Sequence, residues 1–164
     1  MEAVASKAPL MAKGRRFDSL QQEAYLTLWR TYDRLRVLED ELFNRYELTA
    51  QQYNLLRLLG AAQRPVPTLT LAERLISRAP DITRMVDKLE SRGVITRTRS
   101  TKDRREVLVE ITATGTKLLD RIAGPLKACH ERQLGHLSAA ELKALIGLLQ
   151  AARAPHEPDG SQWG

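Results

Sequence analysis

The chain has 164 residues, of which 43% are hydrophobic and 28% are charged, a balance that excludes a disordered chain and describes one globular domain. The sequence has no run of 18 or more apolar residues, the length that a membrane-spanning helix needs. The N-terminal stretch also lacks the apolar segment of a signal peptide, so a cytoplasmic protein is expected. The single cysteine, Cys129, excludes an intramolecular disulfide.

The net charge of +6 is concentrated in one segment. Residues 78–105 contain nine basic and four acidic side chains, a net charge of +5, whereas the rest of the chain carries +1. A protein that neutralises DNA phosphates releases their counterions, so such a basic segment is typical of a nucleic-acid-binding surface.

Residues 1–17 show no periodicity and are interpreted as a flexible N-terminal arm. Through residues 18–48, apolar side chains recur at steps of three and four, which predicts an amphipathic helix of roughly thirty residues. The recurring residues are Tyr25, Leu28, Tyr32, Leu35, Leu38, Leu42 and Tyr46. Because such a helix is longer than one small core, part of its apolar stripe is expected to pack against a second subunit.

A second helix is predicted to begin at the capping box Thr49-Ala-Gln-Gln52 and to end near Ala62. Pro65 and Pro67 cannot continue this helix, because proline lacks the amide donor. Thr70-Leu-Ala-Glu73 has the pattern of another capping box and predicts the start of a short helix.

A third helix is predicted from Pro80 to Arg92 and is ended by Gly93. With the short helix before it and the turn at 77–79, it forms a helix-turn-helix, whose second helix can lie in the major groove of DNA. The residues expected to face inward are Ile82, Met85, Val86 and Leu89, and those expected to face outward are Asp81, Thr83, Arg84, Asp87 and Lys88.

Residues 94–99 and 106–111 are predicted to be two strands of a hairpin. The connecting sequence carries Asp103, Arg104 and Arg105, which on their own would suit a solvated turn. Because the hairpin directly follows the helix-turn-helix, its tip is expected to lie beside the same DNA, within reach of a minor groove.

The remaining residues predict two more helices. Thr112 caps one of them, with Pro125 as an expected kink, and the capping box Ser138-Ala-Ala-Glu141 opens the other. Residues 113–153 are therefore expected to complete a dimerisation lobe, and residues 154–164 have the composition of a disordered tail.

The expected fold is mainly α-helical with a small two- or three-stranded β wing. It consists of a winged helix-turn-helix lobe at residues 49–112 and a helical dimerisation lobe formed by 18–48 and 113–153.

In this order and spacing, the chain resembles the MarR (multiple antibiotic resistance regulator) family of winged helix-turn-helix transcription factors from about Asp18 to Arg153. The resemblance rests on two motifs of the helix-turn-helix and one of the wing. They are Leu71-Ala-Glu-Arg-Leu75, Ile82-Thr-Arg-Met-Val-Asp-Lys-Leu-Glu-Ser-Arg-Gly93, and Asp103-Arg-Arg105 before a strand that ends in Thr112-Ala-Thr-Gly115. It implies a homodimer that binds a palindromic operator in double-stranded DNA and acts by default as a repressor.

The resemblance also implies roles for the wing residues. Arg105 would enter the minor groove, where narrow width concentrates negative potential, and Asp103 would orient either this side chain or the loop. Arg104 would contact a phosphate.

In the recognition helix, Thr83 and Arg84 are the candidates for base contacts, because arginine can bond both major-groove acceptors of guanine. Arg78 and Lys88 are expected to contact phosphates. Asp81 could accept from a cytosine amino group or cap the helix, and the capping role is favoured.

Relatives of this kind commonly bind small anionic aromatic or phenolic effectors in a crevice between the dimerisation helices and the DNA-binding lobe. Trp29, Tyr32 and Tyr53 could line such a crevice here, although aromatic residues at helical spacing also suit a core or an interface.

The sequence gives no sign of an enzyme or of a cofactor. The candidate cluster Cys129-His130-Glu131 with His136 has a poor geometry for catalysis, because adjacent residues on a helix do not face each other, and its spacing is not that of a metal site. Three alternatives stay open: a winged-helix module that contacts only proteins, a regulator that binds no ligand, and a regulator that senses oxidants through Cys129. For Cys129, a role as a small packing residue is favoured.

Overall fold

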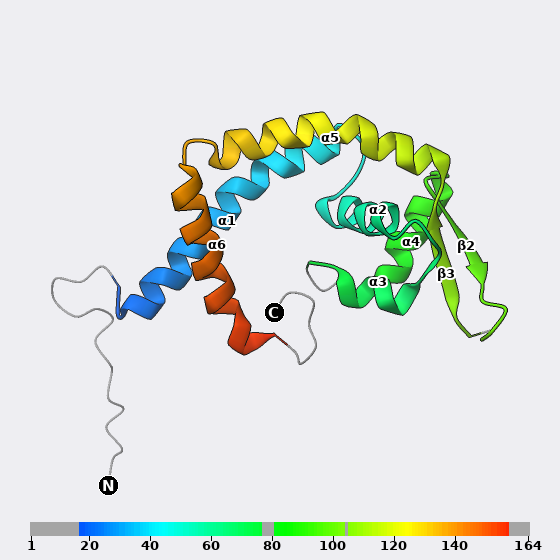
Figure 1. The fold of residues 1–164 in the computed structure, drawn as a ribbon, viewed down its shortest axis with the longest axis horizontal. Coiled ribbons are helices and arrows are strands. Elements are labelled where there is room, and N and C mark those ends of the chain that lie inside the picture. The colour runs from blue at the N-terminus through cyan, green and yellow to red at the C-terminus, as the bar shows by residue number, and fades with distance from the viewer. Residues whose placement is uncertain (1–16, 77–80, 104, 158–164) are drawn as a thin grey trace, which may run out of the picture. The chain divides into compact units, whose positions relative to one another are not determined.

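A computed structural model describes residues 17–76, 81–103 and 105–157 of the chain. Its elements, in chain order, are α1 (Leu20–Asn44), α2 (Ala50–Ala62), β1 (Val66–Pro67), α3 (Thr68–Arg74), α4 (Ile82–Ser91), β2 (Ile95–Arg99), β3 (Val107–Ile111), α5 (Ala113–Leu134), α6 (Ala139–Arg153) and the 3-10 turn η1 (Ala154–His156) (Figure 1). The expected fold class, mainly helical with a small β wing, is confirmed. None of the helices in these ranges is long and apolar enough to cross a membrane.

The chain divides into two units, one up to Leu38 and one from Glu39 onward. The described part of the first unit is almost entirely the first portion of α1, on which large side chains such as Tyr25 and Trp29 are exposed. The helix ends at Asn44 and not at residue 48, because the chain turns at 45–47, where Glu47 has a φ of 54°.

Three predicted helix starts are confirmed. The Thr49 hydroxyl accepts a hydrogen bond from the Gln52 amide at 3.2 Å, and the Gln52 side chain accepts one from the Thr49 amide at 2.9 Å. Ser138 and Glu141 form the same reciprocal pair at the start of α6, and Thr112 caps α5. These bonds satisfy amides that have no partner within their own helix.

The predicted capping box at Thr70–Glu73 is wrong, because α3 already begins at Thr68 and has Pro67 in the capping position. Val66 and Pro67 form strand β1, which pairs with β3, and the Thr68 hydroxyl donates to the Val107 carbonyl at 3.1 Å. This pairing with a strand forty residues away fixes where the chain enters α3.

The sheet is antiparallel and has the order β1-β3-β2, so β3 lies in its centre. Val109 of β3 is fully buried and lies opposite Val66 on one side and Arg97 on the other. Figure 1 shows the β2–β3 hairpin extending from the small helices as a wing.

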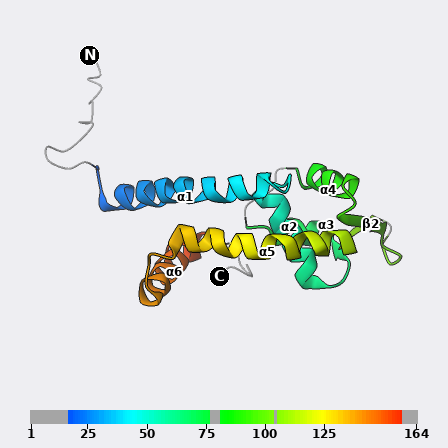
Figure 2. The same ribbon diagram turned by 90° about the horizontal axis from the view of Figure 1, so that it is seen from above.

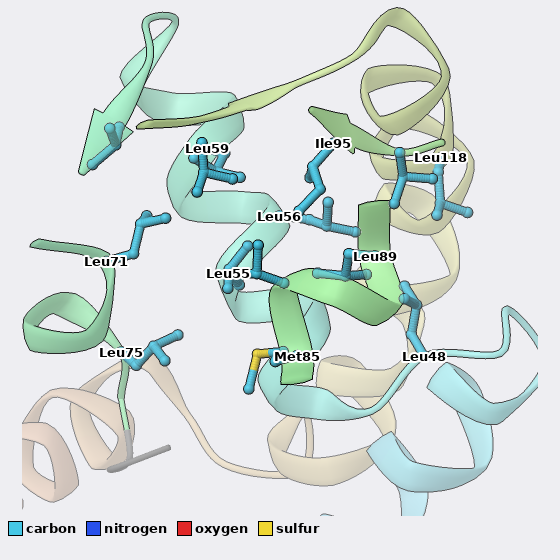
Figure 3. Packing of buried hydrophobic residues seen from close by; sticks show 14 of the residues in the cluster. Leu48, Leu55, Leu56, Leu59, Leu71, Leu75, Met85, Leu89, Ile95 and Leu118 are labelled. Carbon is cyan, nitrogen blue, oxygen red and sulfur yellow. The ribbon is translucent and has the colours of Figure 1, made fainter. Parts of the chain in front are cut away.

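One hydrophobic core holds the helix-turn-helix and the wing together, and Figure 3 shows its side chains pointing toward one another. Helix α2 lies at its centre and, as Figure 2 also shows, α5 runs past it. Its main members are Leu48, Leu55, Leu56, Leu59, Leu71, Leu75, Met85, Val86, Leu89, Ile95, Val109, Leu118 and Ile122. Because α4 buries one whole face here, its opposite face is held at a fixed orientation toward solvent.

Helix α6 is amphipathic in sequence but has no buried residue. Ile146, Leu148 and Leu149 are exposed on it, with Leu148 exposing 70% of its surface. Such a concentration of apolar surface on one helix is typical of a protein interface.

Candidate nucleic-acid interface

Helix α4 presents a polar face opposite its buried one. Met85, Val86 and Leu89 are buried as predicted, whereas Thr83, Arg84 and Lys88 are exposed. The helix begins at Ile82, and Asp81 is its capping residue. Pro80, the predicted first residue, lies outside the described residues, as does Arg78.

Asp81 caps this helix, as the favoured interpretation predicted. Its Oδ1 accepts a hydrogen bond from the Arg84 amide at 2.9 Å, and its Oδ2 lies 3.7 Å from Nε of the same arginine. The Arg84 side chain nevertheless remains 87% exposed. Arg84 therefore places a solvated guanidinium at the N-terminal end of α4, where a recognition helix contacts base edges.

The polar face of α4 borders two grooves. One, of about 740 Å³, is lined by Arg84 and Lys88 together with Thr49 and Gln52 at the start of α2. The other, of about 450 Å³, lies toward the wing and is lined by Thr83, Arg97 and Arg105, among others. The candidate side chains thus divide between the two sides of the helix.

The wing turn is ordered by two side chains. Ser100 is buried, its amide donates to the Glu106 carbonyl at 3.0 Å, and its hydroxyl accepts from the Asp103 amide at 3.3 Å. Asp103 Oδ1 accepts from the Arg105 amide at 2.9 Å. Of the two roles expected for Asp103, these contacts support orienting the loop. The Arg105 side chain is exposed, and Arg104 lies outside the described residues.

Among the described basic residues of 78–105, Arg92 and Arg97 bind other elements of the protein. Arg92 donates to the carbonyls of Tyr46 and Glu47. Arg97, on β2, contacts Asp87 and Glu90 of α4. The hydrogen bonds from Arg97 hold the pKa of Glu90 below its usual range, and Glu90 in turn raises the pKa of Arg97.

The sequence did not predict either role. Arg97 lies seven and ten residues after its partners and Arg92 forty-five residues after Glu47, so neither pair has the spacing of neighbours on one helix.

The three aromatic residues suggested for an effector site differ in their surroundings. Tyr53 is half-buried and stacks on Phe43 with ring centroids 4.7 Å apart, and burial raises its pKa. Trp29 and Tyr32 lie on α1 before Glu39, and each exposes 60% of its surface. Their joint role in a crevice stays a prediction.

A cavity of about 590 Å³ lies next to Tyr53 within the second unit. Its lining combines apolar residues such as Leu126 with the polar side chains of Lys127, His130 and Glu131.

The burial of Cys129 agrees with the favoured packing role, whereas its neighbours His130, Glu131 and His136 are exposed. Cys129 is buried, with 6% of its surface exposed, and burial together with nearby Glu39 raises the pKa of its thiol. His130 Nδ1 lies 3.0 Å from the Gln133 side-chain oxygen and 3.8 Å from Glu39. Within the described ranges, no three His, Cys, Asp or Glu side chains are grouped closely enough to hold a metal ion.

The MarR family model matches residues 48–107 of the chain. The transcriptional regulator HosA of Escherichia coli O157:H7 is 30% identical over 105 residues, which cover 63% of this chain and 76% of HosA. A crystal structure of a MarR transcription factor from Planctomyces limnophilus is 54% identical, with a TM-score of 0.66, and the match covers 83% of this chain and 99% of that one. A mutant MarR from Escherichia coli, complexed with operator DNA, shares the fold at 24% identity and a TM-score of 0.72, over 82% of this chain and 98% of that one.

Proposed function

Because the chain belongs to the MarR family of DNA-binding transcriptional regulators, we propose that it acts as a homodimeric repressor that binds a palindromic operator in double-stranded DNA. The single observation that carries this proposal is the position of the exposed, polar face of α4 next to the exposed Arg105 of the wing. A helix of this size fits the major groove, while a wing beside it can reach the flanking minor groove.

Each exposed side chain then has a distinct task. Arg84 and Thr83 contact base edges, Lys88 contacts a phosphate and Arg105 enters the minor groove. Asp103 keeps the wing turn in the conformation that presents Arg105, since it binds the backbone amide of that residue. Arg78 and Arg104 are assigned to phosphates from the family resemblance.

The exposed apolar side chains of α6, and separately those of the first part of α1, support a dimer. A dimer with two-fold symmetry places its two recognition helices in successive major grooves, with half-sites about 10 base pairs apart. A protein bound across such a site would prevent RNA polymerase from occupying the same DNA, which is the simplest form of repression.

The cavity beside Tyr53 supports regulation by a small aromatic anion. Lys127 and His130 offer donors for a carboxylate or phenolate, and Leu126 and Leu134 offer apolar contacts for a ring. Such a ligand releases DNA only if it binds the protein conformation that does not bind DNA more tightly.

The test is to select duplexes from a random double-stranded DNA pool with the full chain and to sequence them. The proposal expects a palindrome with half-sites about 10 base pairs apart, and weaker binding of that duplex in the presence of salicylate-like compounds. If no sequence is enriched and the protein passes unretained through heparin, the fold serves protein contacts instead and the proposal is wrong.

A further inference from the structure

Arg97 joins the wing to the recognition helix through its whole guanidinium group. Nη1 lies 2.6 Å from Asp87 Oδ1, while Nη2 and Nε lie 2.5 Å and 2.9 Å from Glu90 Oε2. The Arg97 amide also donates to Glu90 Oε1, at 3.1 Å. All three guanidinium nitrogens of one β2 residue therefore bind carboxylates of α4.

This contact lies beside the groups assigned to DNA. Arg97 lines the groove between α4 and the wing, together with Thr83 and Arg105. Asp87 is one helical turn from Thr83 and lies on the exposed side of α4, and its side chain is 53% exposed. Asp87 is thus a negative charge on the surface that would face phosphates.

Unpaired carboxylates on such a surface would repel DNA, since charges within about 10 Å of each other are only partly screened at ordinary salt concentrations. Arg97 offsets this repulsion, and its planar fork suits two carboxylates at once better than a lysine ammonium would. With its nitrogens engaged in this way, the side chain is not oriented toward a phosphate.

We propose that Arg97 is a positioning residue for DNA binding: it neutralises Asp87 and Glu90 on the recognition helix and fixes the wing strand to that helix. This inference rests on the proposed function, because it concerns how the same surface binds DNA. It differs from a phosphate contact in one measurable way, since the effect of Arg97 on DNA affinity depends on Asp87.

The experiment is a double-mutant cycle on the full chain, with affinity measured by fluorescence anisotropy on the selected operator duplex at fixed salt. Arg97→Ala is expected to weaken binding about 10-fold and Asp87→Asn alone to change it less than about twofold. The double variant is expected to recover part of the loss, because Glu90 then still lacks its partner. Arg99→Ala, an exposed arginine on the same strand, is the matched control, and its effect is expected to add to that of Asp87→Asn without coupling.

A second readout needs no DNA. Hydrogen exchange at the backbone amide of residue 97 is expected to be faster in Arg97→Ala and in Glu90→Gln than in the wild type. It is expected to be unchanged in Arg99→Ala, because this substitution does not disturb the contact with Glu90. If Arg97→Ala fails to fold, as judged by circular dichroism, Arg97→Lys takes its place in both measurements, with the same direction expected and a smaller effect.

If Arg97→Ala weakened operator binding by the same factor with and without Asp87→Asn, the inference would be overturned and the proposed function would stand. A wild-type protein that binds no DNA at all would overturn the proposed function, and this inference with it.

Discussion

Arg92, at the C-terminal end of the recognition helix, donates a hydrogen bond to the backbone carbonyl of Glu47, 2.6 Å away in the turn between α1 and α2. Its second terminal nitrogen donates to the Tyr46 carbonyl at 2.9 Å. The Tyr46 hydroxyl in turn donates to the Arg121 carbonyl of α5 at 3.4 Å, and the Arg121 guanidinium lies 5.8 Å from the Tyr46 ring centroid. One turn of the chain thus connects the recognition helix with α5.

Replacement of Arg92 by alanine is expected to lower the free energy of unfolding by roughly 1–2 kcal/mol, because two turn carbonyls lose a charged donor and the bonds are partly exposed. Urea denaturation followed by circular dichroism measures this change. Arg99→Ala serves as the control, since Arg99 is exposed on β2 and its loss should shift the midpoint little. Equal midpoints for the two variants would contradict the structural role of Arg92.

Two glycines of α5 make a matched pair. A Cβ at Gly115 would lie 2.2 Å from the Val94 carbonyl oxygen and 2.7 Å from Ile111 Cγ1, whereas a Cβ at Gly124 would meet nothing within 4 Å. Gly115→Ala is therefore expected to destabilise the protein by about 1–3 kcal/mol through overpacking. Gly124→Ala is expected to stabilise the helix by up to about 1 kcal/mol, since alanine is the better helix former. Urea denaturation of the two variants measures both changes. A destabilised Gly124→Ala together with an unchanged Gly115→Ala would contradict the close packing of Gly115 against Val94 and Ile111.

Leu148→Glu is expected to shift the protein from dimer to monomer, because a charge on the apolar surface of α6 cannot be buried without a partner. Gln150→Glu introduces the same charge change at another exposed position of α6 and should leave the dimer intact. Sedimentation at micromolar concentration separates the 18.5 kDa monomer from the dimer. A wild-type chain that sediments only as the monomer would rule out the proposed assembly.

Cys129 is expected to react slowly with thiol reagents in the folded protein and rapidly after denaturation. Burial, with a smaller contribution from Glu39, raises the pKa of its thiol, so the reactive thiolate is rare at neutral pH. The raised pKa also makes the stability of the fold depend on pH. The folded state holds the proton more tightly, so stability is unaffected below the ordinary thiol pKa and falls as the pH rises through the raised one.

Comparison of Cys129→Ala with the wild type between neutral and alkaline pH isolates this contribution. Rapid labelling of the native thiol at neutral pH would instead favour the alternative of an oxidant-sensing regulator.

The parts of the fold that the sequence predicted correctly depend on chemistry within one helical turn. Thr49 with Gln52, Ser138 with Glu141, and Asp81 with the Arg84 amide each need only a spacing of three residues, which is visible in any sequence. The same holds for Gly93, which was predicted to end the recognition helix: it follows the last turn of α4 and has a φ of 68°.

The parts that the sequence could not predict depend on pairings between distant segments. The start of α3 was misplaced because strand pairing of Val66 with Val109 overrides the local pattern at Thr70. In the candidate site, Arg97 is one of the nine basic residues of 78–105 from which the sequence predicts a DNA-binding surface. The packing of β2 against α4 shows that Arg97 binds carboxylates. The number of charged residues can be counted from a sequence. Which of them pair within the protein, and which are available to a ligand, is known only from the tertiary structure.

The measurement that tests the central claim most directly is a salt titration of operator and random-duplex binding for the wild type, Arg105→Ala and Asp103→Ala. If Arg105 enters the minor groove, its loss should weaken operator binding and reduce the steepness of the salt dependence. Asp103→Ala should reproduce part of this effect, because the turn loses the bond that orders the Arg105 backbone. Operator binding by Arg105→Ala that equals the wild type at every salt concentration would show that the charged tip of the hairpin is only a solvated turn.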